Sequence, residues 1–212
     1  MDARLLAIPT ALAGGAGGTY LGYKYLHQGE QKVSIKSKLG DLLLEFGDNF
    51  SDKWQARAKL VSSKTNLPES LNKLRSSTDP KAISADDIKG WCKDQIEKEF
   101  SSEGDSLFVN IRDYCTFNNK DKIGGTAISE ELTNSDIKAD GKWSKANKKL
   151  SDAPEVGMSE TMKGIKTKVA TSGGTDTKAL RAWCEDIYLA YFKGEEDSDF
   201  KDAKAYCVEA PQ

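Results

Sequence analysis

Four cysteines are the residues of this chain whose spacing most directly implies chemistry. They form two pairs, Cys92 with Cys115 and Cys184 with Cys207, and each pair encloses 22 residues. Each enclosed stretch begins with Trp-Cys and ends with Tyr-Cys, and the two 25-residue stretches share ten identities without a gap. Evenly spaced cysteine pairs are typical of disulfides formed in an oxidising compartment, although four buried reduced thiols would also fit the apolar character of cysteine.

A helical hairpin would bring the two members of each pair to the same height. The midpoint of the first pair falls in the polar turn at 101–106, and the midpoint of the second falls in the turn at 193–198. Facing cysteines at equal height meet the distance condition for a disulfide, so we predict one in each hairpin. A zinc site is disfavoured because no Cys-x-x-Cys pair occurs, and the single histidine, His27, lies near the N-terminus.

Acidic pairs recur in both turns and are the other candidates for chemistry. They are Glu103 with Asp105 and Glu195 with Asp197. Such pairs suit a cation site or a pair of catalytic carboxylates, but solvated acids in a turn beside Gly or Ser are common. One histidine excludes a histidine-based triad in the body, and no phosphate-binding loop is present. The sequence therefore predicts no catalytic, cofactor-binding or metal-binding residue.

Helical patterns surround both cysteine pairs. Ser84 followed by Asp87 has the form of a capping box, and apolar residues then recur at three- and four-residue steps. Further amphipathic helices are predicted near Leu71 and near Met162, and the tryptophans are predicted to anchor the core. The one short run that could form a strand is Leu42-Leu43-Leu44. The predicted fold class is therefore mainly α.

The repeated patterns predict two tandem duplicated small helical modules, at 33–117 and 126–209. Residues 118–125 between them are polar and end in two glycines, which is typical of a linker. Two landmarks define the copies besides the cysteines. They are an Ile and a Leu four residues apart, starting at Ile35 or Ile128, and a Lys-Trp pair, Lys53-Trp54 or Lys142-Trp143.

Residues 1–27 form a different region, which we predict to be an apolar helix serving as an anchor or signal. Residues 5–23 carry no charge, and a helix of that length spans about 28 Å, enough to cross a bilayer. Gly14, Gly18 and Gly22 lie four residues apart, a spacing that allows two membrane helices to dimerise. A cleaved signal peptide and a soluble glycine-rich tail are the alternatives.

Charge excludes one class of partner and leaves the orientation open. Lys and Arg total 31 against 33 Asp and Glu, and the basic residues are dispersed, so nucleic-acid binding gains no support. Lysines at 24, 32, 36 and 38 follow the apolar segment and favour a cytoplasmic body, whereas paired cysteines favour an extracellular one.

The order of these features resembles the large paralogous families of uncharacterised membrane-anchored proteins in haemotropic mycoplasmas. The resemblance rests on the glycine-rich apolar start ending in Tyr20-Leu21-Gly22-Tyr23, the Ile-x-x-x-Leu segment, and the Lys-Trp, Trp-Cys and Tyr-Cys pairs. It implies a helical module behind a membrane anchor, displayed by a wall-less cell that lives on red blood cells. It supplies no catalytic or binding residue.

These observations together predict a membrane-anchored surface protein that serves interaction or antigenic display, with its body outside the cell and a host or surface protein as its partner. Two alternatives remain at this point. One is a solute-binding protein or enzyme with a cleft between the modules, which the acidic turns suggest. The other is a cytoplasmic scaffold with reduced thiols, which the lysine-rich flank suggests.

Overall fold

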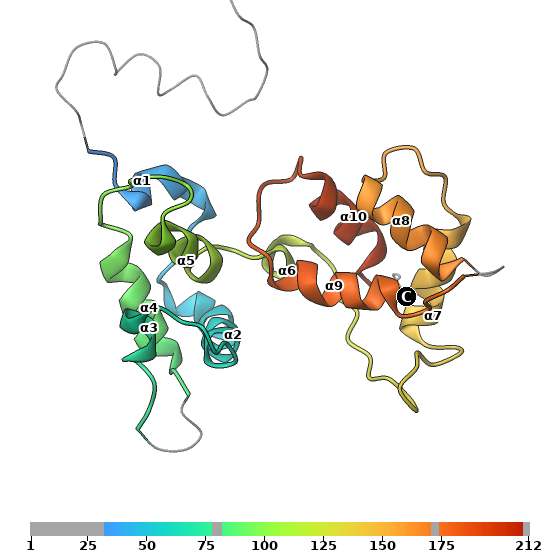
Figure 1. Cartoon of the computed structure of the whole chain (residues 1–212), viewed down its shortest axis with the longest axis horizontal. Coiled ribbons are helices and arrows are strands. Elements are labelled where there is room, and N and C mark those ends of the chain that lie inside the picture. Colours follow the sequence, from blue (N-terminus) through green and yellow to red (C-terminus); the bar gives the residue numbers. More distant parts are fainter. Residues whose placement is uncertain (1–31, 78–81, 171–173, 210–212) are drawn as a thin grey trace, which may run out of the picture. The chain divides into compact units, whose positions relative to one another are not determined.

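The computed structural model describes residues 32–77, 82–170 and 174–209 (Figure 1). From Val33 onward the chain forms one compact unit. The described part contains α-helices, two short 3-10 helices and isolated β-bridges but no strand, which confirms the mainly helical prediction. None of the helices described is both long and apolar enough to cross a membrane. The predicted apolar segment at 5–23, with its three spaced glycines, lies outside the described residues.

The first half of the unit consists of α1 (Ile35–Leu39), η1 (Gly40–Leu42), η2 (Asp48–Phe50), α2 (Ser51–Ser62), α3 (Glu69–Asn72), α4 (Ala85–Gln95) and α5 (Ser106–Cys115). Helix α4 packs against α2 on one side and α5 on another. The predicted strand at 42–44 is wrong, because its first residue ends η1 and Leu43 makes only an isolated bridge with Thr116.

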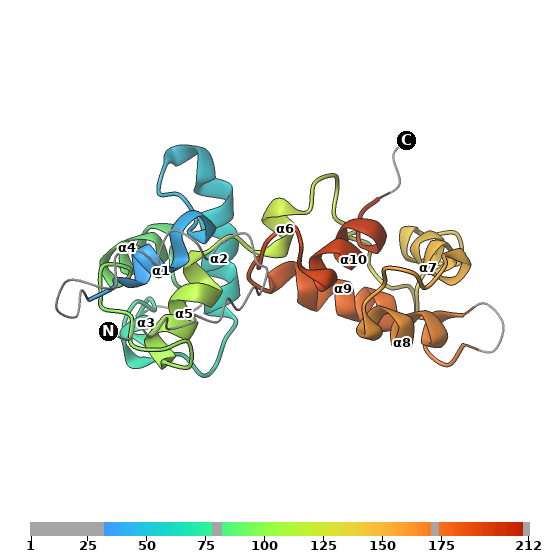
Figure 2. The same ribbon diagram turned by 90° about the horizontal axis from the view of Figure 1, so that it is seen from above.

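The second half consists of α6 (Asn119–Lys122), α7 (Lys142–Asp152), α8 (Glu160–Val169), α9 (Ala179–Leu189) and α10 (Ser198–Tyr206). Helix α9 is central, since it contacts α6, α7, α8 and α10 (Figures 1 and 2). The amphipathic helix predicted near Met162 is therefore confirmed as α8, and the one predicted near Leu71 as the short α3.

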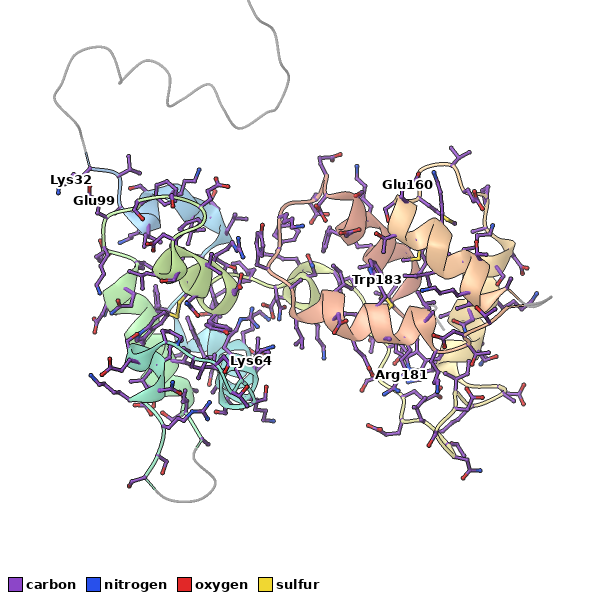
Figure 3. The ribbon with its side chains drawn as sticks, viewed as in Figure 1. Lys32, Lys64, Glu99, Glu160, Arg181 and Trp183 are labelled. Atoms are coloured by element: carbon purple, nitrogen blue, oxygen red, sulfur yellow. A yellow bond between two sulfur atoms is a disulfide. The ribbon has the colours of Figure 1, made fainter. Side chains whose placement is uncertain are left out.

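Two antiparallel hairpins, α4–α5 and α9–α10, carry the four cysteines. Disulfides join Cys92 to Cys115 and Cys184 to Cys207, and the Cα–Cα distance is 5.6 Å in both (Figure 3). The predicted pairing is thus confirmed. The hairpins also match in their aromatic packing, since an edge-to-face phenylalanine pair lies 4.9 Å apart in the first and 4.7 Å apart in the second; the rings belong to Phe100 and Phe108, and to Phe192 and Phe200.

Local signals position the hairpin helices. Ser84 accepts a hydrogen bond from the Asp87 backbone N–H while Asp87 caps in return, so the predicted capping box is confirmed. Asp105 and Asp197 are the N-cap residues of α5 and α10. Their carboxylates satisfy backbone N–H groups that a helix start leaves without an internal partner.

Three of the four tryptophans anchor the core as predicted. Trp54 on α2 and Trp143 on α7 are fully buried, and each indole donates a hydrogen bond to a backbone carbonyl, at 3.0 Å and 3.3 Å respectively. Trp91 is also buried, and its indole donates to the Ser70 hydroxyl at 3.2 Å. Trp183 differs because it is only partly buried where it packs on the core from α9 (Figure 3).

The polar segment at 118–125, predicted as a linker, instead begins with helix α6. Asn118 caps this helix by accepting from the Asp121 backbone N–H, just as Ser34 caps α1 by accepting from Ser37. Both cap residues also form an isolated antiparallel bridge to a residue that follows the first helix of a cysteine hairpin, Ser34 with Glu99 after α4 and Asn118 with Tyr191 after α9. Helix α6 therefore occupies the position in the second half that α1 occupies in the first.

This correspondence changes how the two halves align. The sequence pattern matched Ile35 with Ile128, but the hydrogen bonds match Leu44 with Ile128. Leu44 N donates to Cys115 O at 2.9 Å, and Ile128 N donates to Cys207 O at 3.0 Å. The shared Ile-x-x-x-Leu spacing therefore does not mark equivalent positions. The equivalent positions are those whose backbone N–H groups bond to the second cysteine of each hairpin.

Phe117 belongs to both halves. Its backbone N–H donates to Leu42 O and completes the first half, and its carbonyl accepts from Phe192 N in the second, both at 2.8 Å. One residue thus ends one hairpin's pairing and starts the next, so the halves follow each other directly.

Candidate functional site

The four cysteines have a structural role in this fold. All are fully buried, both disulfides are formed, and no free cysteine remains. A reactive thiol needs exposure and thiolate character, which a buried disulfide does not offer.

The acidic turns act as helix caps and in surface ion pairs. Asp105 accepts from Leu107 N at 2.9 Å, and Asp197 accepts from Phe200 N at 3.1 Å. Their neighbours Glu103 and Glu195 lie 3.0 Å from the ammonium groups of Lys38 and Lys204. The described residues contain no group of His, Cys, Asp or Glu that could hold a metal ion. The paired acids are thus accounted for by helix capping and solvent-exposed charge pairing.

A buried ion pair marks the joint between the halves. Arg57 on α2 is 1% exposed, and its guanidinium donates to the Asp121 carboxylate on α6 and, at 2.9 Å, to Thr116 O. A charged group at this depth requires a counter-charge and hydrogen bonds. Asp121 supplies the charge and also accepts from Asn118 N at 3.0 Å. The Arg57–Asp121 pair therefore links α2 to α6.

The second half contains the counterpart of α2 in helix α7. Residues 54, 57, 58 and 61 are the buried positions of α2, and 143, 146, 147 and 150 are those of α7. The spacing is identical when Trp54 is matched with Trp143, and both indoles bond to backbone carbonyls as described. Arg57 then corresponds to Ala146, which is also buried but carries no charge.

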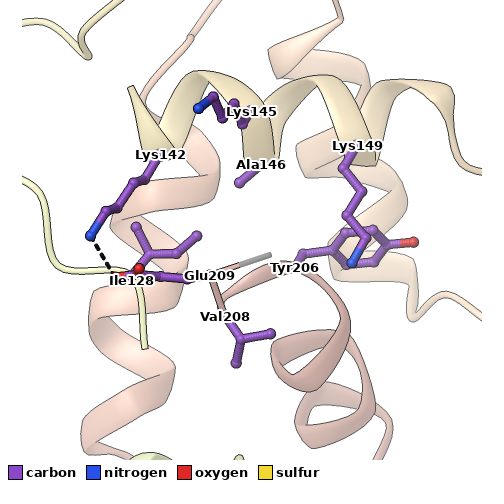
Figure 4. Close-up of a pocket in the computed structure, with 8 residues that line it drawn as sticks. All are labelled: Ile128, Lys142, Lys145, Ala146, Lys149, Tyr206, Val208 and Glu209. Atoms are coloured by element: carbon purple, nitrogen blue, oxygen red, sulfur yellow. Dashed lines mark hydrogen bonds and ion pairs between the residues drawn. The ribbon is translucent and has the colours of Figure 1, made fainter. Parts of the chain in front are cut away.

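A cavity of about 290 Å³ lies against this face of α7 (Figure 4). Its apolar floor comes from Ile128, Ala146 and Val208, and Tyr206 adds an aromatic wall. Its rim carries one acid and three ammonium groups, those of Glu209, Lys142, Lys145 and Lys149. The site combines an apolar base with a positively charged edge.

The charges at the rim are partly paired. Lys142 Nζ lies 2.7 Å from Glu209 Oε1, while Lys149 Nζ donates to the carbonyl of Ala205 at 2.7 Å and lies 5.8 Å from the Tyr206 ring centroid (Figure 4). Lys145 makes no ion pair with any residue that the structure describes. Burial and the nearby Asp202 charge raise the pKa of Tyr206, so its hydroxyl stays neutral at physiological pH. Three cations against one carboxylate leave an excess of positive charge.

The apolar floor and the positively charged rim suit the binding of an anionic ligand that has an apolar part. The ammonium groups of its three lysines are of the type that recognises anions. This cavity was not among the sites predicted from the sequence. The available signal was the spacing of Lys142, Lys145 and Lys149 at three- and four-residue steps, which puts them on one face of a helix.

No family model, no curated protein and no solved structure matches this chain.

Proposed function

We propose that this chain is a membrane-anchored surface protein whose helical body lies outside the cell and serves interaction or antigenic display. In this proposal residues 5–23 form the anchor, and the body is a tandem duplication that binds a host or surface protein. The proposal keeps the expectation drawn from the resemblance to the families of haemotropic mycoplasmas.

The observation that carries the proposal is the use of all four cysteines in two matching hairpins. A disulfide stabilises a small domain mainly by restricting its unfolded state, and such bonds persist in oxidising environments. Both bridges hold the same type of helix pair, with the same Cα–Cα distance of 5.6 Å. An extracellular body with limited apolar surface gains the most from this device.

Matching contacts support the duplication. The disulfides, the edge-to-face phenylalanine pairs, the indole hydrogen bonds and the bridges of the cap residues recur in the same order along both halves. Four kinds of contact of chance origin would not recur in one order in both halves, whereas duplication of one helical unit produces that recurrence. The repeat boundary under this proposal falls at Phe117, because α6 takes the position of α1.

Protection of the cysteines and accessibility of the body test the proposal together. Intact source cells are treated with a protease, and the native chain is separately denatured, alkylated without reduction and weighed by mass spectrometry. We expect the body to be digested while a cytoplasmic control protein survives, and we expect alkylation of four cysteines only after reduction. A protected body whose four cysteines alkylate freely would place it in the cytoplasm and overturn the proposal.

The glycine spacing in the anchor is tested separately. If Gly14, Gly18 and Gly22 form the contact between two anchors, Gly18→Leu will prevent close approach of the helices. We expect cross-linking in membranes to yield dimers for the wild type and for a control, Ala16→Leu, but few for Gly18→Leu. Equal yields in all three would refute the helix dimer without touching the surface location.

A further inference from the structure

We propose that the face of α7 formed by Lys142, Lys145, Ala146 and Lys149 binds an acidic polypeptide segment of a partner protein. This deepens the proposed interaction role and rests on it, because it assigns the partner's chemistry to a site. On α7 the segment would take the position that the start of α6 takes beside α2 in the first half.

The matching face of α2 lies beside the α6 segment. Position by position, the α7 face corresponds to Lys53, Ala56, Arg57 and Leu60. Arg57 is buried and Lys53 and Leu60 are partly buried, whereas Ala56 is exposed. All four line a recess together with Asn118, Lys120 and Asp121 of the α6 segment and with Leu189 at the end of α9. In this recess Asp121 of the α6 segment pairs with Arg57, so an acid on a polypeptide segment already meets a cation on this type of helix face.

The contact on α2 depends on a carboxylate. The Asp121 carboxylate reaches the buried Arg57 guanidinium from the first turn of α6, and the same carboxylate helps to cap that helix. A short segment that presents an acid at its start can thus pair with a cation on this helix face.

Helix α7 differs from α2 in where its face carries positive charge. Arg57 is replaced by Ala146, which leaves the cavity, while Ala56 and Leu60 are replaced by Lys145 and Lys149. The cation of α2 that has no lysine counterpart is the buried Arg57, whereas the added cations of α7, Lys145 and Lys149, lie at the rim of the cavity. With Glu209 paired to Lys142, two ammonium groups exceed the local acid, so charge complementarity requires a segment with more than one carboxylate.

The apolar floor of the cavity favours an acidic polypeptide over other anions. A bare inorganic anion would leave the apolar floor of Ile128, Ala146 and Val208 exposed to water, at a cost that grows with the area left uncovered. A nucleic acid is disfavoured because the basic residues of the chain are dispersed and its net charge is −2. An acidic segment that also carries an apolar side chain fills the floor and pairs with the rim.

The probe is a peptide derived from the chain's own covering segment. Residues 117–125 are synthesised with Lys120→Glu and Lys122→Glu, capped at both ends and labelled with a fluorophore. The matched neutral peptide carries glutamine at those two positions and asparagine in place of Asp121. Each is titrated with the full-length oxidised chain in a non-ionic detergent, and fluorescence anisotropy reports binding.

The expected result is saturable binding of the acidic peptide and at least about tenfold weaker binding of the neutral one, a difference of about 1.4 kcal/mol. Lys145→Glu with Lys149→Glu should weaken the acidic peptide by about tenfold or more, and raised salt should weaken it as well. Lys148→Glu is the control, since Lys148 lies on the same helix outside the cavity and pairs with Asp152 at 2.9 Å. Melting curves confirm that each variant is folded.

Three outcomes would overturn the inference. The acidic peptide fails to saturate, or it binds the double variant as tightly as the wild type, or octanoate occupies the site while the peptide does not. The third outcome would assign the cavity to small carboxylates. All three leave the surface location untouched, because protease accessibility and cysteine alkylation measure it independently.

Discussion

Arg57 and Asp121 form a buried ion pair that ties the first cysteine hairpin unit to the helix that starts the second. The pair spans 64 residues of sequence and joins α2 to α6. Its side chains are 1% and 10% exposed, so neither charge is solvated once the pair is broken. Truncating one member of such a pair leaves the other buried without compensation.

We therefore predict that Arg57→Met lowers the free energy of unfolding by about 3–5 kcal/mol. Asp121→Asn should also destabilise, because it removes the counter-charge of a guanidinium. The double variant Arg57→Met with Asp121→Leu should cost less than the sum of its parts. Urea denaturation followed by circular dichroism measures all three. Lys53→Met, on the same helix with its ammonium 3.8 Å from Asp52, is the control and should change little.

The two disulfides should contribute equally. Each closes a loop with a sequence separation of 23 residues, and loop closure of that length is worth about 3 kcal/mol. We expect Cys92→Ala with Cys115→Ala, and likewise Cys184→Ala with Cys207→Ala, each to reduce stability by that amount. Denaturant midpoints of both variants, with and without reductant, give the test. A reductant that leaves the wild-type midpoint unchanged would contradict a stabilising role.

The acidic turns distinguish capping from cation binding. Asp105 accepts from the N–H groups of Leu107 and Phe108, at 2.9 and 3.1 Å, so Asp105→Ala should lower stability by about 1 kcal/mol. Glu103→Ala should cost little, because its ion pair with Lys38 is exposed. Thermal melting of both variants measures the difference. Addition of Ca²⁺ should leave the wild-type melting temperature unchanged, and a calcium-dependent rise abolished by Asp105→Ala would favour a cation site.

We expect ionisation of Tyr188 to lower the free energy of unfolding at alkaline pH. Its buried hydroxyl donates to the Cys207 carbonyl, and burial raises the pKa of Tyr188 from 10.0 to about 12. The unfolded chain loses this proton at lower pH than the folded chain does. The contribution is therefore fully present below pH 10 and is lost as pH rises through about 12.

Tyr188→Phe tests this dependence directly. We expect it to cost about 1 kcal/mol at neutral pH through the lost hydrogen bond and to flatten the decline in stability above pH 10. The decline will persist in part, since burial also raises the pKa of Tyr114 and Tyr206. Unfolding curves at a series of pH values give the slope. Tyr191→Phe, on a partly exposed ring, is the control and should retain the wild-type profile.

Local patterns in the sequence determined most of the hairpin architecture. The spacing around Cys92 and Cys115 indicated a helical hairpin with both cysteines at the same height, and Ser84 with Asp87 indicated where its first helix begins. These predictions succeeded because helix period, capping and antiparallel height depend on residues close together in the chain. The same reasoning found the core tryptophans, apart from the half-buried Trp183.

Tertiary structure alone decided where the second half begins and where a ligand can bind. Residues 118–125 have the composition of a linker, yet Asn118 is buried and Asp121 is partly buried, because α6 packs against α9 and Asp121 pairs with Arg57 of α2. The cavity on α7 likewise exists only in the folded chain, which brings Ile128, Ala146 and Val208 together. Such features arise from contacts between residues far apart in sequence, which no local periodicity records.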